Sequence, residues 1–168
     1  SVNLALIASA LIALAEPSAE IDKRIVTIGG AATEIVFALG AGSSIVATDL
    51  SSIYPPQARE LPMVGYVRNI SPEGVLSMEP DLVIATGALG PPNARQMLER
   101  LDIDIIWLPK LSTPEELLSS IKTVSERLSR IEAAKTLIED VNRGLTQAAA
   151  NSSNWTEEAP TVLFLLEP

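Results

Sequence analysis

The chain has 168 residues, with 12 lysines and arginines against 21 aspartates and glutamates and a formal net charge of −9. This acidic balance, without any run of basic residues, excludes the electrostatic surface that binds phosphate backbones, so nucleic acid is not an expected partner. The chain has no cysteine and no histidine, which excludes tetrahedral zinc sites, thiol nucleophiles, Ser-His-Asp triads and imidazole ligation of haem iron within it. Any metal must therefore be held by oxygen ligands.

The N-terminus begins with an uncharged apolar run at 2–15. Its length is typical of the core of a signal peptide and is too short to span a bilayer. Ala13-Leu14-Ala15 has the small-x-small pattern that signal peptidase recognises, so we expect cleavage before Glu16. We interpret 1–15 as a signal peptide whose basic first region is missing, and we expect a periplasmic mature protein. A buried N-terminal helix is the alternative.

Short β-branched runs alternate with longer amphipathic runs after the leader, which is typical of βαβ units with a parallel sheet. The pattern predicts strands at 25–28, 45–48, 82–85 and 105–108, and helices at 31–39, 72–78 and 93–101. Ser71-Pro72 and Thr113-Pro114 each pair an N-cap residue with a proline at the first helical position, and Glu116 completes a capping box in the second. These are the clearest local signals for helix starts.

A helical period of apolar residues continues from 114 to about 150, as one long helix or as two with a break at Ser129-Arg130. A polar linker at 151–158 and a buried-type strand at 161–166 follow. The predicted fold class is therefore α/β. It has a Rossmann-like parallel-sheet lobe at 16–112, a helix pair at 113–150 that includes a long inter-lobe helix, and a linker with the first strand of a truncated second lobe at 151–168.

A ligand site in such a sheet lies outside the carboxyl ends of the strands. The loops expected there cover 29–32, 49–70, 86–92 and 109–112. The second is unusual, because about twenty residues without clear secondary structure in a compact α/β unit are either functional or misassigned. This loop carries both tyrosines of the chain, Tyr54 and Tyr66.

Tyr66 and Arg68 form the pair of greatest chemical interest. If 65–68 is extended, strand alternation places both side chains on the same side. A ferric ion and a neighbouring cation both favour the phenolate, and tyrosinate is a documented axial ligand of haem iron. Arg68 would then hold the phenolate oxygen or a haem propionate through charge-assisted hydrogen bonds. The plainer alternative is a half-buried packing tyrosine whose hydroxyl contacts water.

Other loop residues at the same edge have less specific signals. Tyr54 is better explained as a wall of the cleft than as a ligand. Gly87, Gly90 and Pro91 belong to a loop that is a turn by composition and the lining of a flat apolar ligand by position, and both interpretations stay open. Lys110 is a surface lysine or a partner of a propionate.

Several segments resemble the first lobe of the substrate-binding proteins that serve iron-complex ABC importers. The general resemblance lies in 24–30, 33–36, 38–42 and 51–55, and the segments 61–68 and 71–83 are similar to the haem-binding branch. Within these segments, Glu79-Pro80-Asp81-Leu82-Val83 is common to the superfamily, whereas Gly65-Tyr66-Val67-Arg68 is the part that indicates haem.

The resemblance implies a two-lobed monomer that binds haem in its cleft and docks on an ABC permease in the inner membrane, with 131–150 as the rigid bridge between the lobes. It implies that Tyr66 is an axial ligand of the haem iron, that Arg68 supports it, and that the protein catalyses no reaction. Several members take a second ligand from a histidine just after the strand that matches 162–166. Here Leu166-Glu167-Pro168 stands in that place, which leaves the coordination number open.

Two other readings remain. One is a ferric-siderophore or cobalamin binder of the same fold, although the chain offers few of the basic or aromatic residues that an anionic ferric chelate would need. The other is a nucleotide-dependent α/β enzyme. Gly29-Gly30 precedes a helix, but its spacing is not G-x-G-x-x-G, and a tight turn explains it better than a phosphate cradle.

Overall fold

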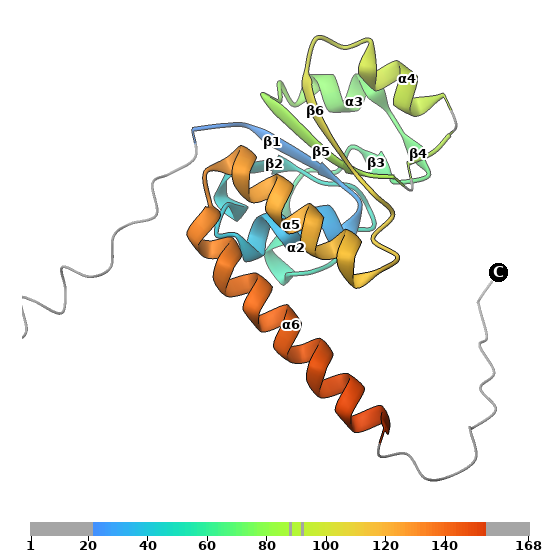
Figure 1. The fold of residues 1–168 in the computed structure, drawn as a ribbon. Coiled ribbons are helices and arrows are strands. Elements are labelled where there is room, and N and C mark those ends of the chain that lie inside the picture. Colours follow the sequence, from blue (N-terminus) through green and yellow to red (C-terminus); the bar gives the residue numbers. More distant parts are fainter. Residues whose placement is uncertain (1–21, 88, 92, 154–168) are drawn as a thin grey trace, which may run out of the picture.

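The computed structural model describes residues 22–87, 89–91 and 93–153 (Figure 1). The predicted leader at 1–15 and the predicted strand at 161–166 lie outside these residues.

Four parallel strands form the central sheet in the order β2-β1-β5-β6 (Figure 1). The four strands predicted between 25 and 108 are each confirmed to within one residue at either end. The two central strands, β1 and β5, are buried along their whole length, as expected for a sheet covered on both faces. The strands span Ile25–Ile28 (β1), Ile45–Ala47 (β2), Leu82–Thr86 (β5) and Asp104–Leu108 (β6).

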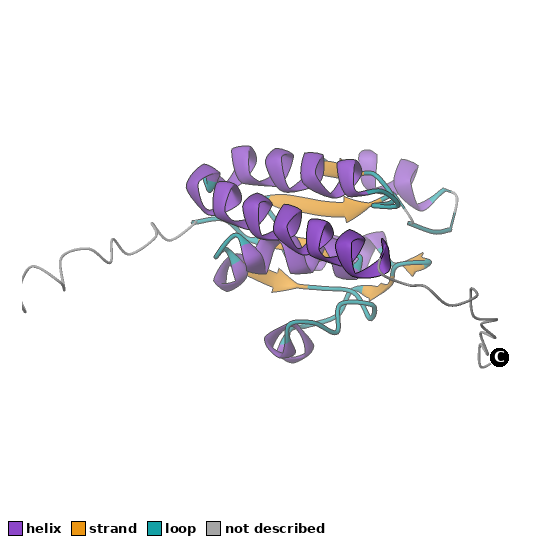
Figure 2. Ribbon diagram, turned by 60° about the horizontal axis from the view of Figure 1, so that its bottom comes forward, coloured by secondary structure: helices purple, strands orange, loops and turns teal. Residues whose placement is uncertain are grey.

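Helices cover both faces of the sheet (Figures 1 and 2). One apolar core joins the sheet to α2, α5 and α6, and a second joins its other face to α3 and α4. Successive residues of β1 divide between them, because Ile25 packs in the first core and Val26 in the second. The helices span Gly30–Ala38 (α2), Pro72–Ser77 (α3), Ala94–Glu99 (α4), Pro114–Leu128 (α5) and Ile131–Ser153 (α6).

The two predicted helix starts are confirmed by their cap hydrogen bonds. Ser71 Oγ accepts from the Gly74 N–H at 3.0 Å, and Thr113 Oγ1 accepts from the Glu116 N–H at 3.2 Å. The Glu116 carboxylate reaches back to the N–H of Ser112, one residue before the cap. Both helices therefore begin where local chemistry satisfies their first backbone donors.

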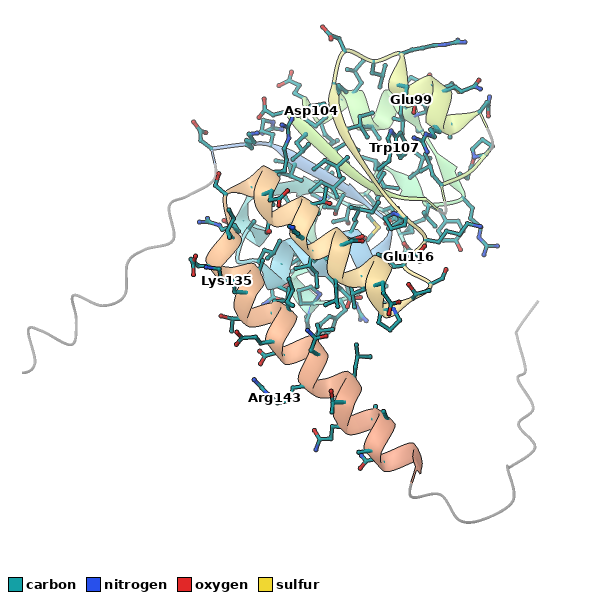
Figure 3. All side chains as sticks on the ribbon, viewed as in Figure 1. Glu99, Asp104, Trp107, Glu116, Lys135 and Arg143 are labelled. Carbon is teal, nitrogen blue, oxygen red and sulfur yellow. The ribbon has the colours of Figure 1, made fainter. Side chains whose placement is uncertain are left out.

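The predicted break at Ser129-Arg130 is also confirmed. Ser129 has a left-handed conformation, with φ 55° and ψ 42°, which ends α5 and lets α6 turn back along it. Arg127 in the last turn of α5 forms an ion pair with Asp104 at the start of β6. This pair ties the end of α5 to the edge of the sheet; Figure 3 labels Asp104 there.

Helix α6 is longer than predicted and extends away from the sheet (Figure 1). Its 23 residues span about 35 Å. The first half packs on the core through Ala134, Leu137, Ile138 and Val141, whereas residues 142–151 are exposed.

The predicted start of a linker at 151 is wrong, because residues 151–153 are still helical and no glycine or proline interrupts the helix there. None of the helices among the described residues is both long and apolar enough to span a bilayer.

The loop at 49–70 was predicted to have no clear secondary structure, and this is wrong. It contains a short 3₁₀ helix, η2, at Pro56–Glu60 and an antiparallel hairpin formed by β3, Gly65–Tyr66, and β4, Asn69–Ile70. A second 3₁₀ turn, η1, at Gly42–Ser44 leads from α2 into β2. The segment is thus an ordered part of the lobe.

The left-handed junction gives a test of the helix pair. Ser129→Gly removes the Cβ that penalises this conformation, so we expect the free energy of unfolding to rise by about 0.5 kcal/mol or more. Glu126→Gly is the matched control, because it places glycine inside α5 and should lower that free energy by about 1 kcal/mol. Urea unfolding of both variants measures the difference, and a loss of stability in Ser129→Gly would contradict the observed junction.

Candidate functional site

The loops at the carboxyl edge of the sheet meet at one buried carboxylate. Asp49 follows β2 and is fully buried. Its Oδ1 accepts hydrogen bonds from the Gly29 N–H at 2.7 Å and the Ser52 hydroxyl at 2.9 Å. Its Oδ2 accepts from the Ser51 N–H at 3.0 Å, the Ser51 hydroxyl at 2.7 Å and the Val67 N–H at 3.1 Å. Asp49 thus joins the end of β1, its own loop and the β3–β4 hairpin.

A chain of buried hydroxyls connects this carboxylate to β1 and α2. The Thr27 and Thr33 hydroxyl oxygens lie 2.7 Å apart, and Thr33 Oγ1 lies 2.7 Å from Ser52 Oγ. Since Ser52 donates its proton to Asp49, Thr33 must donate to Ser52 and Thr27 to Thr33. The Asp49 carboxylate therefore sets the donor direction of each hydrogen bond in this series of hydroxyl groups. Each of these buried hydroxyls has a hydrogen-bond partner.

The hairpin corrects the predicted geometry of Tyr66 and Arg68. Val67 and Arg68 form its two-residue turn, so 65–68 is not extended and strand alternation does not relate the two side chains. The chain turns here because Val67 and Ile70 are buried in the second core while Asp49 holds the Val67 N–H. Tyr66 and Arg68 are both exposed, and no hydrogen bond joins these two described residues.

Two neighbouring loops clamp the hairpin in place. The Leu50 N–H donates to the Gly65 carbonyl at 2.8 Å, and on the other side the Gly90 N–H donates to the Val67 carbonyl at 2.8 Å. Contact with the second loop is tight, because a Cβ at position 90 would lie 2.8 Å from the Arg68 carbonyl oxygen. Gly90 thus lies against the hairpin, and its small size allows the close approach.

Exposed apolar side chains are frequent in the segment 49–70, which contains the hairpin. Five of the eight large hydrophobic side chains that are exposed in the described residues lie between 49 and 70, and Tyr66 is 43% exposed among them. Exposed apolar surface of this kind marks binding sites more often than a random part of a surface. These five residues, called here the apolar rim, are Leu50, Ile53, Tyr54, Met63 and Tyr66.

The other predicted site residues are more dispersed. Tyr54 lines a shallow groove against α2 together with Glu34 and Phe37. Gly87 packs against the end of β6, where a Cβ would lie 3.2 Å from the Leu108 carbonyl oxygen. Pro91 follows Gly90 in the clamping loop, and Lys110 is exposed after β6.

Trp107 is half-buried against the second core. The Arg95 guanidinium lies over its ring, 4.5 Å from the centroid, and forms an ion pair with Glu99 at 2.8 Å. Figure 3 shows Trp107 and Glu99 on the same side of the lobe. These three residues form a packing arrangement on α4 and β6.

The oxygen donors available for a metal in the described residues are few. No group of three or more acidic residues lies close enough together in this part of the chain to hold an ion. An exposed phenol at the carboxyl edge, surrounded by apolar side chains, suits a flat apolar ligand that carries its own metal. Tyr66 is an exposed phenol at this edge, and Leu50, whose N–H donates to the neighbouring Gly65 carbonyl, is exposed as well.

Sequence reasoning did not single out Asp49 or its hydroxyl partners Thr27, Thr33 and Ser52. A signal for Asp49 was present, because an aspartate directly after a buried strand and before Ser51-Ser52 favours a turn in which the carboxylate accepts nearby N–H groups. The partners at Gly29 and Val67 come from distant parts of the chain, and no local pattern indicates them.

Comparison with known proteins shows similarity to periplasmic binding proteins. Residues 25–168 match the family described as periplasmic binding protein. Over 133 residues the chain is 34% identical to a vitamin B12-binding protein of Vibrio cholerae. The aligned region covers 77% of this chain and 48% of that protein.

Two solved structures share the fold at similar identity. A periplasmic haem-binding protein of Pseudomonas aeruginosa matches with a TM-score of 0.71 and 34% identity, over 78% of this chain and 49% of that one. The periplasmic haem-binding protein HutB of Vibrio cholerae matches with a TM-score of 0.67 and 35% identity, over 80% of this chain and 51% of that one. The chain spans about half the length of these relatives, and all three are named for what they bind, none as an enzyme.

Because the loop at 89–91 packs on the hairpin, we expect alanine substitution to change the free energy of unfolding differently at Gly90 and at Gly144. Gly90→Ala should lower the free energy of unfolding by about 1–3 kcal/mol, because the new methyl group meets the Arg68 backbone. Gly144→Ala in α6 is the control, since no atom lies within 4 Å of a Cβ there, and it should be neutral or stabilising. Urea unfolding compares the two, and equal stability would show that the loop at 89–91 does not pack on the hairpin.

Proposed function

The chain belongs to the periplasmic binding protein family, and we propose that it is the N-terminal lobe and inter-lobe helix of an exported protein that delivers ferric haem to an ABC importer. Tyr66 coordinates the iron and the apolar rim contacts the porphyrin. The lobe binds its ligand without changing it chemically. The family and the relatives' names support this role, because the family consists of binding proteins rather than enzymes.

The observation that carries the proposal is the position of Tyr66. Its side chain is exposed on a hairpin that is clamped at the carboxyl edge of the sheet, with Leu50 and Met63 exposed nearby in the apolar rim. A phenolate oxygen is a suitable ligand for ferric iron in haem, and apolar side chains suit the porphyrin faces. The chain has no histidine to serve instead.

Arg68 supports the same ligand from the turn of the hairpin. Its guanidinium is exposed and forms no hydrogen bond or ion pair with the described residues. It is therefore free to donate a charge-assisted hydrogen bond to the phenolate oxygen of a coordinated Tyr66 or to a haem propionate. Such a cation matters in a chain with a net charge of −9.

Helix α6 is the proposed connection to a second lobe. Its first half packs on the first core, and its side chains at 142–151 are exposed, including Leu145. An apolar side chain on this projecting half, together with relatives about twice as long as the chain, supports a bridge whose far end contacts another domain. The periplasmic location, the monomeric state and the docking on a permease are further parts of the proposal.

Cobalamin is the second candidate ligand, and the relative named as a vitamin B12-binding protein favours it. A corrinoid would use the apolar rim as a wall and would need contact area from Tyr66 rather than a phenolate oxygen. The two candidates therefore differ in what they require of one hydroxyl group.

Titration of ferric haem into the chain, followed by visible absorbance, tests this difference. We expect a shifted Soret band and a phenolate-to-iron charge-transfer band. Tyr66→Phe should abolish the charge-transfer band and weaken binding by about tenfold or more, equivalent to at least about 1.4 kcal/mol. Tyr54→Phe is the matched control and should retain the band.

Identical haem spectra for the unmodified chain and Tyr66→Phe would remove Tyr66 as the ligand. A parallel titration with cobalamin identifies the alternative. Saturable cobalamin binding of equal strength in both proteins would transfer the proposal to cobalamin.

A further inference from the structure

The backbone on both sides of Tyr66 is held by two consecutive residues. The Gly65 carbonyl, in the peptide group before Tyr66, accepts from the Leu50 N–H at 2.8 Å. The Val67 N–H, in the peptide group after Tyr66, donates to Asp49 Oδ2 at 3.1 Å. Because peptide groups are planar, fixing both of them leaves the φ and ψ of Tyr66 little freedom. The direction of its Cα–Cβ bond is thereby set before any ligand arrives.

Several hydrogen bonds hold the Asp49 side chain in place. Besides the Val67 N–H, its carboxylate accepts four hydrogen bonds, among them one from the Gly29 N–H at the end of β1. The Thr27–Thr33–Ser52 hydroxyl chain extends this support to the middle of β1 and to α2. Tyr66 is thus connected through one side chain to the most deeply buried strand of the sheet.

We infer that Asp49 is the positioning residue that aims the Tyr66 phenol at the iron, an inference that rests on the proposed function of Tyr66. Asp49 touches no ligand, and it acts through the Val67 N–H and the hairpin. A carboxylate is needed because both of its oxygens accept hydrogen bonds, whereas an asparagine amide would accept on one side and present N–H groups on the other. Either orientation of that amide leaves a backbone N–H unpaired, at Gly29 or at Val67.

Three variants of the full chain test this inference. Asp49→Ala removes all five hydrogen bonds, and Asp49→Asn keeps the volume and removes acceptance on one side. Thr33→Val is the control, because it breaks the hydroxyl chain but leaves the contact between Asp49 and Val67 in place. Amide hydrogen exchange at Gly29 and Val67 is measured without ligand, and the charge-transfer band is measured with ferric haem at a temperature where each variant is folded.

We expect the band to follow the protection of the Val67 N–H and not the overall stability. Asp49→Ala should exchange at Val67 about tenfold faster or more and lose the band, whereas Thr33→Val should keep both its Val67 protection and the band although it is destabilised. Asp49→Asn should lose the band if its Val67 N–H is freed, and should keep it if only Gly29 is freed. If Asp49→Ala does not fold, Asp49→Asn and Thr33→Val still make this comparison.

A freed Val67 N–H with an unchanged charge-transfer band would overturn the positioning role while leaving Tyr66 as the ligand. Loss of the band in Thr33→Val with Val67 still protected would overturn it as well, because the effect would then come from general destabilisation. Equal spectra for the unmodified chain and Tyr66→Phe would overturn the proposed function, and the positioning role with it. The Tyr66→Phe spectrum therefore distinguishes the two failures.

Discussion

One buried carboxylate organises the edge of the sheet at which the chain can bind a ligand. Backbone N–H groups from the end of β1, from the loop after β2 and from the β3–β4 hairpin all donate to Asp49. Each of these donors would cost free energy if it were buried without a partner, so the three segments have to converge on the same point. The long loop at 49–70 is ordered for this reason. Its order depends on satisfying backbone donors at one acceptor as much as on burying apolar side chains.

The parts of the fold that could be predicted from the sequence are those determined by neighbours along the chain. The strands β1 and β5 are continuous apolar runs, and the starts of α3 and α5 are set by Ser71 and Thr113 within a single turn of helix. The end of α6 was not predictable in this way. The apolar period predicted helix to about residue 150, but residues 142–151 are exposed, so no buried contact marks where the helix ends. Only the absence of a glycine or proline at 151–153 indicated that the helix continues.

The candidate site was predictable as a place but not as a geometry. Parallel topology located it at the loop that carries Tyr66, yet the sequence from Gly65 to Ile70 has no Asn-Gly or Asp-Gly pair to indicate a two-residue turn. The turn forms because Asp49 and the Gly90 loop hold the backbone of Val67 from two sides, and both contacts are distant in sequence. For the same reason Asp49 could not be distinguished among 21 acidic residues. Its importance comes from burial and from partners that only the folded chain brings together.

The distinction between the two candidate ligands depends on rigidity more than on composition. The apolar rim offers exposed surface that a porphyrin or a corrinoid could use equally, because apolar contact is not directional. An iron ligand, in contrast, has to present one oxygen atom at a defined distance and angle. A hairpin whose peptide groups are already fixed on both sides of Tyr66 loses little conformational entropy when that bond forms. If Tyr66 supplied only apolar contact area, fixing its backbone would improve binding much less. The hydrogen bonds with Asp49 and Leu50 that fix the backbone on both sides of Tyr66 are therefore an argument for coordination.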